Sequence, residues 1–157
     1  MKKYEFTGET KVIDDWRGIV TLHRIRSVVE FGLIKVGELG GWIEKEENLS
    51  HEDKSWVWGD AEVCGNAKVC GNAEVCKTTH IIVIGPIGSR NDFTTFFRDK
   101  DNEITVKCGC FLGKIDNFLK KVASTHGDTK YAIVYRAAVE LAKQQIELDK
   151  TEEKGGE

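Results

Sequence analysis

A six-residue repeat between Val57 and Ile87 constrains this chain more than any other feature. An aliphatic residue recurs at every sixth position, namely Val57, Val63, Val69, Val75, Ile81 and Ile87. A small residue follows each of the first five at an interval of four: Ala61, Ala67, Ala73, Thr79 and Gly85. This period is typical of a hexapeptide parallel β-helix, in which three short sides form one coil of about eighteen residues. An α-helix is disfavoured, because each glycine of the repeat would cost it about 1 kcal/mol. We therefore predict a short left-handed parallel β-helix.

The repeat also predicts the direction of its side chains. Because successive residues of a strand point to opposite sides, the valines and alanines should point inward and Cys64, Cys70 and Cys76 outward. At eighteen residues per coil, Val57 should stack on Val75, Val63 on Ile81 and Val69 on Ile87. The three cysteines would then lie on three different faces. We expect neither disulfides nor a metal site among them.

The chain divides into four predicted parts. Residues 1–44 alternate like strands and are interpreted as a β meander that caps the coil, and residues 45–88 contain the coil itself. Residues 89–150 are predicted to form a C-terminal α+β module, with a β-hairpin followed by two helices. The hairpin pairs Phe93–Arg98 with Glu103–Cys108, and the helices are Ile115–Ala123 and Lys130–Leu148, the second capped by Asp128. The apolar-free segment 151–157 is expected to be disordered.

Composition excludes some classes of partner. The formal net charge is −3 and charged residues make up 31% of the chain, so there is no basic field to hold a nucleic-acid polymer. No apolar run approaches the ~20 residues that cross a membrane. The Met1-Lys2-Lys3 start is not followed by the apolar core of a signal peptide. We expect a cytoplasmic protein without a membrane partner.

A glycine-rich loop after the repeat is the first candidate ligand site. The segment Gly85-Pro86-Ile87-Gly88-Ser89-Arg90 offers backbone N–H groups, a hydroxyl and a guanidinium, which suit a phosphate or a carboxylate. It lacks the Gly-Lys-Ser/Thr ending of a Walker loop, and a plain turn is the alternative interpretation. Arg98, on the next predicted strand, is the expected second cation.

Two further groups lie near the predicted helices. Cys108 and Cys110 could hold zinc only with more ligands, and His126 is the sole nearby candidate. A Cys/His nucleophile pair would lack an orienting group, so packing of Cys108 and Cys110 at a strand end is favoured. His126 either contacts a ligand or caps the preceding helix. Tyr135, one helical turn after Tyr131, either covers a bound base or packs in the core. We expect no catalytic residue, metal or cofactor.

Several of these motifs together resemble a known family. They are Gly37–Glu44, Asn48-Leu49-Ser50, the Gly-Asn-Ala hexads, Gly85–Arg90, Cys108–Phe111 and Thr125–Asp128. The chain resembles, from about residue 20 to about residue 146, a family of small β-helix proteins common in bacteriophages and prophages. It carries fewer hexads than many members. The resemblance implies a phage origin and a β-helix fold, whereas activity is not known for most members.

A phage origin suggests a function. Small phage proteins without a replication, packaging or lysis signature often counter host defence. Our leading hypothesis is a non-enzymatic binding protein that sequesters a phosphate-bearing nucleotide immune signal in the bacterial host cell. Gly88, Ser89, Arg90 and Arg98 would hold the phosphates, and His126 or Tyr135 would contact the base or sugar. The chain would form a dimer or trimer through the flat coil faces.

Two other functions stay open. A hexapeptide-type acyltransferase would use acetyl-CoA and a coil histidine, here His80, but a coil of about two turns disfavours it. A protein-binding inhibitor would contact a host defence enzyme through the acidic loop 44–54 or the exposed coil face.

Overall fold

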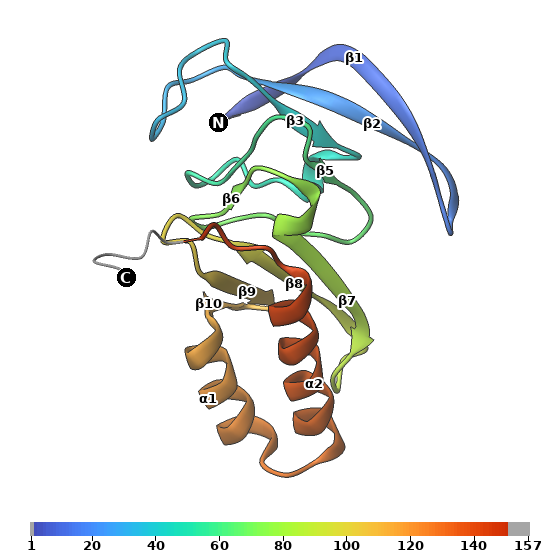
Figure 1. The fold of residues 1–157 in the computed structure, drawn as a ribbon, viewed down its shortest axis with the longest axis vertical. Coiled ribbons are helices and arrows are strands. Elements are labelled where there is room, and N and C mark those ends of the chain that lie inside the picture. The colour runs from blue at the N-terminus through green and yellow to red at the C-terminus, as the bar shows by residue number, and fades with distance from the viewer. Residues whose placement is uncertain (1, 151–157) are drawn as a thin grey trace.

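The computed structural model describes residues 2–150, and the predicted disordered tail, 151–157, lies outside the described residues. Between residues 2 and 150 the fold has two four-stranded sheets, one pair of very short strands and two helices (Figure 1). The strands are β1 (Tyr4–Asp15), β2 (Gly18–Ser27), β3 (Leu39–Ile43), β4 (Trp56–Val57), β5 (Glu62–Val63), β6 (Glu74–Val75), β7 (Ile81–Ile87), β8 (Asp92–Arg98), β9 (Ile104–Cys108) and β10 (Phe111–Lys114). The helices are α1 (Ile115–His126) and α2 (Lys130–Gln145). Short 3-10 turns span Glu46–Asn48 and Thr78–His80.

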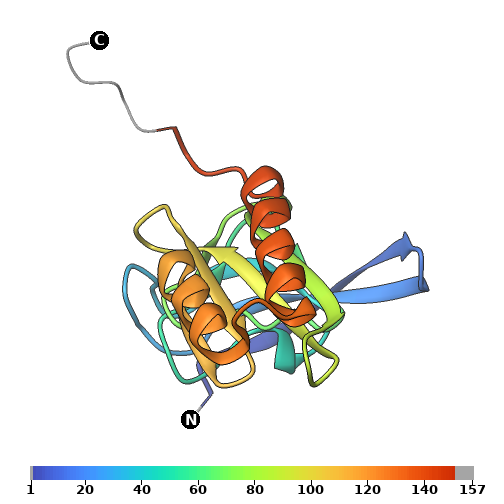
Figure 2. The same ribbon diagram turned by 90° about the horizontal axis from the view of Figure 1, so that it is seen from below.

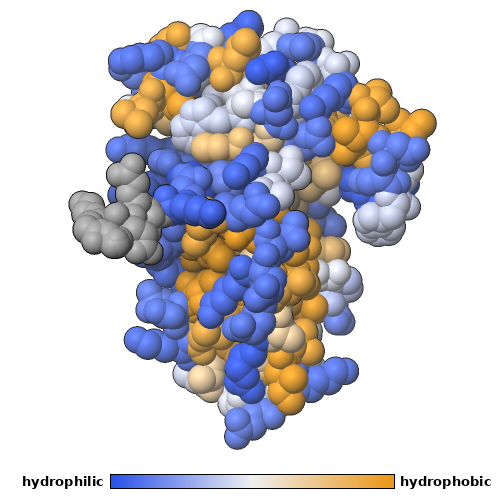
Figure 3. Space-filling model, in the orientation of Figure 1, coloured by the Kyte–Doolittle hydropathy of each residue, from blue (hydrophilic) through white to orange (hydrophobic). Residues whose placement is uncertain are grey.

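The first sheet contains a long hairpin that leaves the body of the protein. Strands β1 and β2 pair antiparallel, with a register shift between Phe6 and Thr10, and β2 continues the sheet through β3 to β5. Figure 2 shows the far end of this hairpin projecting sideways. We call residues 8–20 the arm. The outer side of the arm is apolar and exposed, as Figure 3 shows, and Trp16 at its tip is 92% exposed.

The predicted left-handed β-helix is wrong. The sheets are mostly antiparallel, and within residues 2–150 parallel pairing is confined to β3 with β5, β4 with β6 and the bridge between Leu49 and Val69. Only one predicted stack forms, that of Val57 on Val75. Val63 pairs with Ile43 and Val69 with Leu49, while Ile81 and Ile87 lie in the antiparallel strand β7.

The physical reason lies at the end of the repeat. Strands of two residues give each hexad one short pairing, and the regular Val-Cys-Gly-Asn-Ala pattern ends at Cys76. After the 3-10 turn the chain enters the apolar run Ile81–Ile84, which forms a long antiparallel hairpin with β8. β-Branched residues favour such a strand. The inward direction of the repeat side chains is nevertheless confirmed, because the valines and alanines from Val57 to Val75 are all buried.

The C-terminal half follows the predicted elements. The hairpin of β8 and β9 and both helices are confirmed, with α1 three residues longer and α2 three residues shorter than predicted. The predicted cap is wrong: Thr129 rather than Asp128 is the N-cap of α2, and it makes no side-chain capping bond.

The second sheet, in the order β10-β9-β8-β7, separates two cores. Both helices cover one face of it, as Figures 1 and 2 show from two sides. Phe96 of β8 packs on the helix side with Phe118 and Val139, whereas Phe97 packs on the other side with the buried residues of the repeat. This alternation along one strand is what a sheet buried on both faces requires.

Candidate functional site

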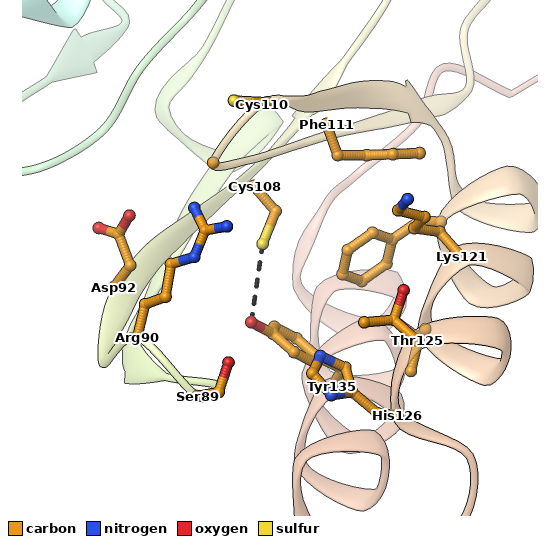
Figure 4. A pocket seen from close by; sticks show the side chains of 13 residues that line it. Ser89, Arg90, Asp92, Cys108, Cys110, Phe111, Lys121, Thr125, His126 and Tyr135 are labelled. Carbon is orange, nitrogen blue, oxygen red and sulfur yellow. Dashed lines mark hydrogen bonds between the residues drawn. The ribbon is translucent and has the colours of Figure 1, made fainter.

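A hollow of about 300 Å³ lies at one end of the second sheet, on its helix side. The turn after β7, the turn between β9 and β10, helix α1 and Tyr135 of α2 enclose it (Figure 4). We call it the helix-side hollow. Its polar lining is Ser89, Arg90, Asp92, Lys121, Thr125 and His126, with Cys108 and Cys110 on the β9–β10 turn.

The turn after β7 is shaped by contact with Tyr135. Gly88 has a φ of +81°, and a Cβ added to it would lie 1.9 Å from Tyr135 Oη. Both the backbone conformation and the lack of space therefore strongly disfavour a residue with a side chain at this position. The Asn91 N–H donates to the Gly88 carbonyl at 3.2 Å and closes the turn. The turn thus presents Ser89 and Arg90 at the hollow.

Two cations stand on opposite sides of the hollow. Arg90 extends from the β7–β8 turn, and Lys121 extends from α1 (Figure 4). In the part of the chain that the structure describes, neither side chain forms a salt bridge or a hydrogen bond with the protein. Among the residues that the structure describes, Asp92 is the one carboxylate in the lining. Two unpaired cations against one carboxylate leave a net positive charge for an anionic ligand.

Aromatic rings form one wall. The His126 and Tyr135 rings stack, with centroids 5.8 Å apart and an interplanar angle of 28°. Phe118 meets Tyr135 edge to face at 5.5 Å and holds it from behind. Flat rings at the surface of a hollow suit a planar ligand group, because offset stacking adds about 0.5–1.5 kcal/mol to simple burial.

Tyr135 is a neutral hydrogen-bond donor at physiological pH. Burial raises the pKa of Tyr135 to about 12. Cys108 Sγ donates to Tyr135 Oη at 3.8 Å. The hydroxyl proton of Tyr135 is therefore left for another acceptor, such as a ligand oxygen.

The structure brings together five of the six predicted ligand residues. Ser89, Arg90, His126 and Tyr135 line the helix-side hollow, and Gly88 contacts Tyr135 beside it. Sequence reasoning missed Lys121 and Thr125. The signal was present, because Lys121, Thr125 and His126 recur at helical spacing on the face of α1 that also carries Phe118.

Arg98 is the residue that does not join them. It lies at the opposite end of β8 from Asp92, about 20 Å away for six residues of strand. Its guanidinium is buried and donates to the Glu74 carbonyl at 3.0 Å, to Asn102 Oδ1 at 3.1 Å and to Asp149 Oδ2 at 2.7 Å. Arg98 therefore anchors the chain after α2 to the sheet.

The geometry disfavours the histidine needed for acyl transfer. His80 is 1% exposed, and its Nδ1 accepts the Cys76 N–H at 2.9 Å. Burial lowers the pKa of His80, and the positive charges of Arg98 and Lys77 lower it further. A base enclosed in this way has no access to an acceptor substrate.

The acidic loop 44–54 is engaged by the protein itself. Asp53 accepts the Gly71 N–H at 2.6 Å and faces the buried ammonium of Lys3 at 3.7 Å. Glu46 pairs with His51 at 2.9 Å. These contacts give the loop a structural role.

The described residues also bear on metals and membranes. Within residues 2–150 no three histidine, cysteine or acidic side chains are grouped as metal ligands would be. Cys108 is half-buried at the end of β9 and Cys110 is exposed. Neither α1 nor α2, the helices in this part of the chain, has the length and apolar character needed to span a bilayer.

No protein-family model and no curated protein matches this sequence.

Proposed function

We propose that the protein binds a phosphate-bearing small molecule, a nucleotide, in the helix-side hollow and does not turn it over. The observation that carries the proposal is the pair of cations, Arg90 and Lys121, which lack protein partners in the described chain and face a stacked aromatic wall. Positive charge beside flat rings matches the two chemical parts of a nucleotide, its phosphate and its base.

Each group has a role in this proposal. Arg90 donates two N–H bonds to phosphate oxygens, because its fork-shaped guanidinium matches that geometry, and Lys121 adds a point charge from the other side. Ser89 and Thr125 supply hydroxyl hydrogen bonds. The base lies against the His126 and Tyr135 rings, with the free Tyr135 hydroxyl donating to it or to the sugar.

Binding without turnover is proposed because of how the candidate nucleophile is placed. Cys108 donates its hydrogen bond to Tyr135, whose pKa is raised, and His126 stacks on the Tyr135 ring. A cysteine nucleophile is commonly activated by a base in hydrogen-bond contact, and here Cys108 instead contacts the neutral Tyr135 hydroxyl. The described lining supplies charge, hydrogen bonds and rings, which are the requirements of a binding site.

The biological role follows from the phage resemblance. A phage protein that holds a nucleotide without consuming it would sequester a signal of the bacterial host and so counter antiviral defence. Because each protein molecule would hold its ligand without consuming it, the effect would depend on the concentration of the protein relative to that of the signal.

Isothermal titration calorimetry tests the binding. AMP, GMP, ADP-ribose, cyclic dinucleotides and inorganic phosphate are titrated into the wild type, Arg90→Ala and Lys121→Ala. Each lost charge-assisted contact should weaken binding roughly 10- to 100-fold, from about 1.5–3 kcal/mol. Arg136→Ala and Lys120→Ala, exposed neighbours outside the lining, are the matched controls and should bind normally. Absence of binding by the whole panel, or equal losses in the controls, would refute the proposal.

A second function, inhibition of a host protein by direct contact, is favoured by the arm. Its exposed Val12, Trp16 and Ile19 form an apolar surface of the kind that marks interaction sites. Plaque counts on a defended host separate the two functions. If Arg90→Ala with Lys121→Ala abolishes protection of the phage and Trp16→Ser with Ile19→Ser does not, the nucleotide function holds. The reverse result favours protein contact.

A further inference from the structure

A second hollow adjoins the first through a shared residue. It has a volume of about 230 Å³ and is lined on one side by Asp92 and Phe93 of β8. The other side is lined by Lys45 of the acidic loop and by Asn66 and Lys68 of the repeat. We call it the coil-side hollow. Asp92 also lines the helix-side hollow. The two hollows therefore meet at the first residue of β8.

Strand geometry explains why the two hollows lie on opposite faces of the second sheet. Successive side chains of β8 point to opposite faces of the sheet, so Phe93 faces the repeat region. Thr95, two residues further on, confirms this direction, because its Oγ1 accepts the Lys68 N–H at 3.1 Å. Asp92 lies at the end of the strand, where the two faces meet. A ligand that occupied both hollows would have to pass the side chain of Asp92.

The coil-side hollow offers a ring and balanced polar groups. Phe93 lies against Gly85, where an added Cβ would meet the ring at 2.6 Å, and this close contact fixes its position. Lys45 and Lys68 are exposed and form no salt bridge within residues 2–150. The carboxylates of Glu47 and Asp92 balance their charges. Such a lining suits an uncharged polar ring system, such as a nucleoside, better than a second phosphate.

We propose that the ligand is a dinucleotide that occupies both hollows. One nucleoside lies against His126 and Tyr135, the phosphate linkage lies at Arg90, and the second nucleoside lies against Phe93. Arg90 suits the linkage because it leaves the same turn that ends at Asp92. Neither hollow alone exceeds the lower end of the ~300–1,000 Å³ range of ligand sites, so one hollow holds one nucleotide and two are needed for a dinucleotide. This inference rests on the proposed function.

Paired titrations test it. AMP and GMP are compared with the linear dinucleotides pApA and pGpG and with their cyclic 3′,5′-linked forms, on the wild type, Arg90→Ala, Lys45→Ala with Lys68→Ala, and Phe93→Leu. A dinucleotide should bind at least 10-fold tighter than its mononucleotide. The lysine pair and Phe93→Leu should reduce that advantage and leave mononucleotide affinity unchanged, whereas Arg90→Ala should weaken both.

The outcomes separate the two claims. Equal affinity for mononucleotide and dinucleotide overturns the two-hollow inference and leaves the proposed function intact if Arg90→Ala still weakens binding. Coil-side variants that lower both affinities equally also overturn the two-hollow inference alone. If no nucleotide binds the folded wild type, the proposed function fails and the inference fails with it. Lys120→Ala again serves as the control.

Discussion

The contact between Gly88 and Tyr135 permits a sharp test of the site geometry. In Gly88→Ala the new Cβ would lie 1.9 Å from Tyr135 Oη and 2.7 Å from its Cζ, distances that real Cβ atoms do not tolerate. Tyr135 is buried among Phe118 and Val139, so it cannot move without disturbing that core. Overpacking of this kind costs about 1–3 kcal/mol. The φ of +81° adds about 1–2 kcal/mol for a residue other than glycine. We expect Gly88→Ala to lower the free energy of unfolding by about 2–5 kcal/mol.

A matched glycine separates strain from collision. Gly37 has a φ of +86°, close to that of Gly88, and a Cβ added there would meet nothing within 4 Å. Gly37→Ala should therefore cost only the conformational part, about 1–2 kcal/mol. The difference between the two variants measures the collision with Tyr135.

A double-mutant cycle measures the same collision independently. Tyr135→Phe removes the hydroxyl that lies closest and costs little by itself, since its bond with Cys108 is 3.8 Å long. In that background the Cβ of Gly88→Ala meets the ring carbons at 2.7 and 3.3 Å but no hydroxyl, and the substitution should be less destabilising by about 1 kcal/mol or more. Urea unfolding followed by tryptophan fluorescence gives all four free energies. Identical effects of Gly88→Ala in both backgrounds, or equal costs at Gly37 and Gly88, would refute the proposed packing of the turn on Tyr135.

Three further predictions concern the frame around the site. Arg98→Ala should cost about 2–4 kcal/mol of unfolding free energy in urea, because it leaves a void and removes the hydrogen bonds to Glu74, Asn102 and Asp149. Asp149→Ala should cost about 1 kcal/mol, and equal costs for the two variants would contradict the anchoring role of Arg98. Asn48→Ala should lower the free energy of unfolding by about 2–4 kcal/mol, since the buried amide donates to the Gly65 and Ala67 carbonyls at 3.1 and 2.9 Å. A loss below about 0.5 kcal/mol, the size expected for a surface substitution, would contradict this prediction. Burial lowers the pKa of Lys3 from 10.5 to about 8, although the charge of Asp53 opposes this shift. Between these two pH values the unfolded chain therefore binds more protons than the folded protein. The stability of the wild type should then rise with pH relative to that of Lys3→Met. Thermal unfolding of both proteins at pH 7 to 10.5 measures this difference in stability. A wild type that loses stability relative to Lys3→Met over that range would contradict the lowered pKa of Lys3.

The repeat determined the burial of its side chains but not their pairing. The alternation of Val63 and Ala67 with polar residues is local information, and both are buried as predicted. Which strand lies beside Val63 depends on the path of the whole chain, and Ile43, twenty residues earlier, takes the place predicted for Ile81. Ile81 is aliphatic and six residues after Val75, so it fits the period, yet it begins a strand of seven residues. A single period therefore cannot distinguish a coil that continues from one that ends.

The candidate site was predictable where it depended on local chemistry. The segment Gly88-Ser89-Arg90 was recognised from residue types alone, and it does form a turn at a hollow. Lys121 was missed because a lysine on an exposed helix face is ordinarily only solvated surface. Its importance depends on the distance between α1 and the β7–β8 turn, which the sequence does not state.

The connectivity of the second sheet explains why Arg90 and Cys108 lie at the helix-side hollow as neighbours and why Arg98 does not. In an antiparallel meander the first and third turns lie at one end and the second turn lies at the other. The β7–β8 turn with Arg90 and the β9–β10 turn with Cys108 therefore meet at the same end, and the β8–β9 turn that follows Arg98 lies at the far end. The hairpin of β8 and β9 was itself predicted, with Arg98 at its turn, so the separation of Arg98 from the glycine-rich loop followed from the sequence without any structure. The same argument places Asp92 and Phe93, at the start of β8, within reach of both faces at the end where the two turns gather. A ligand that binds there can contact both sides of the sheet, which no position in the middle of β8 would allow.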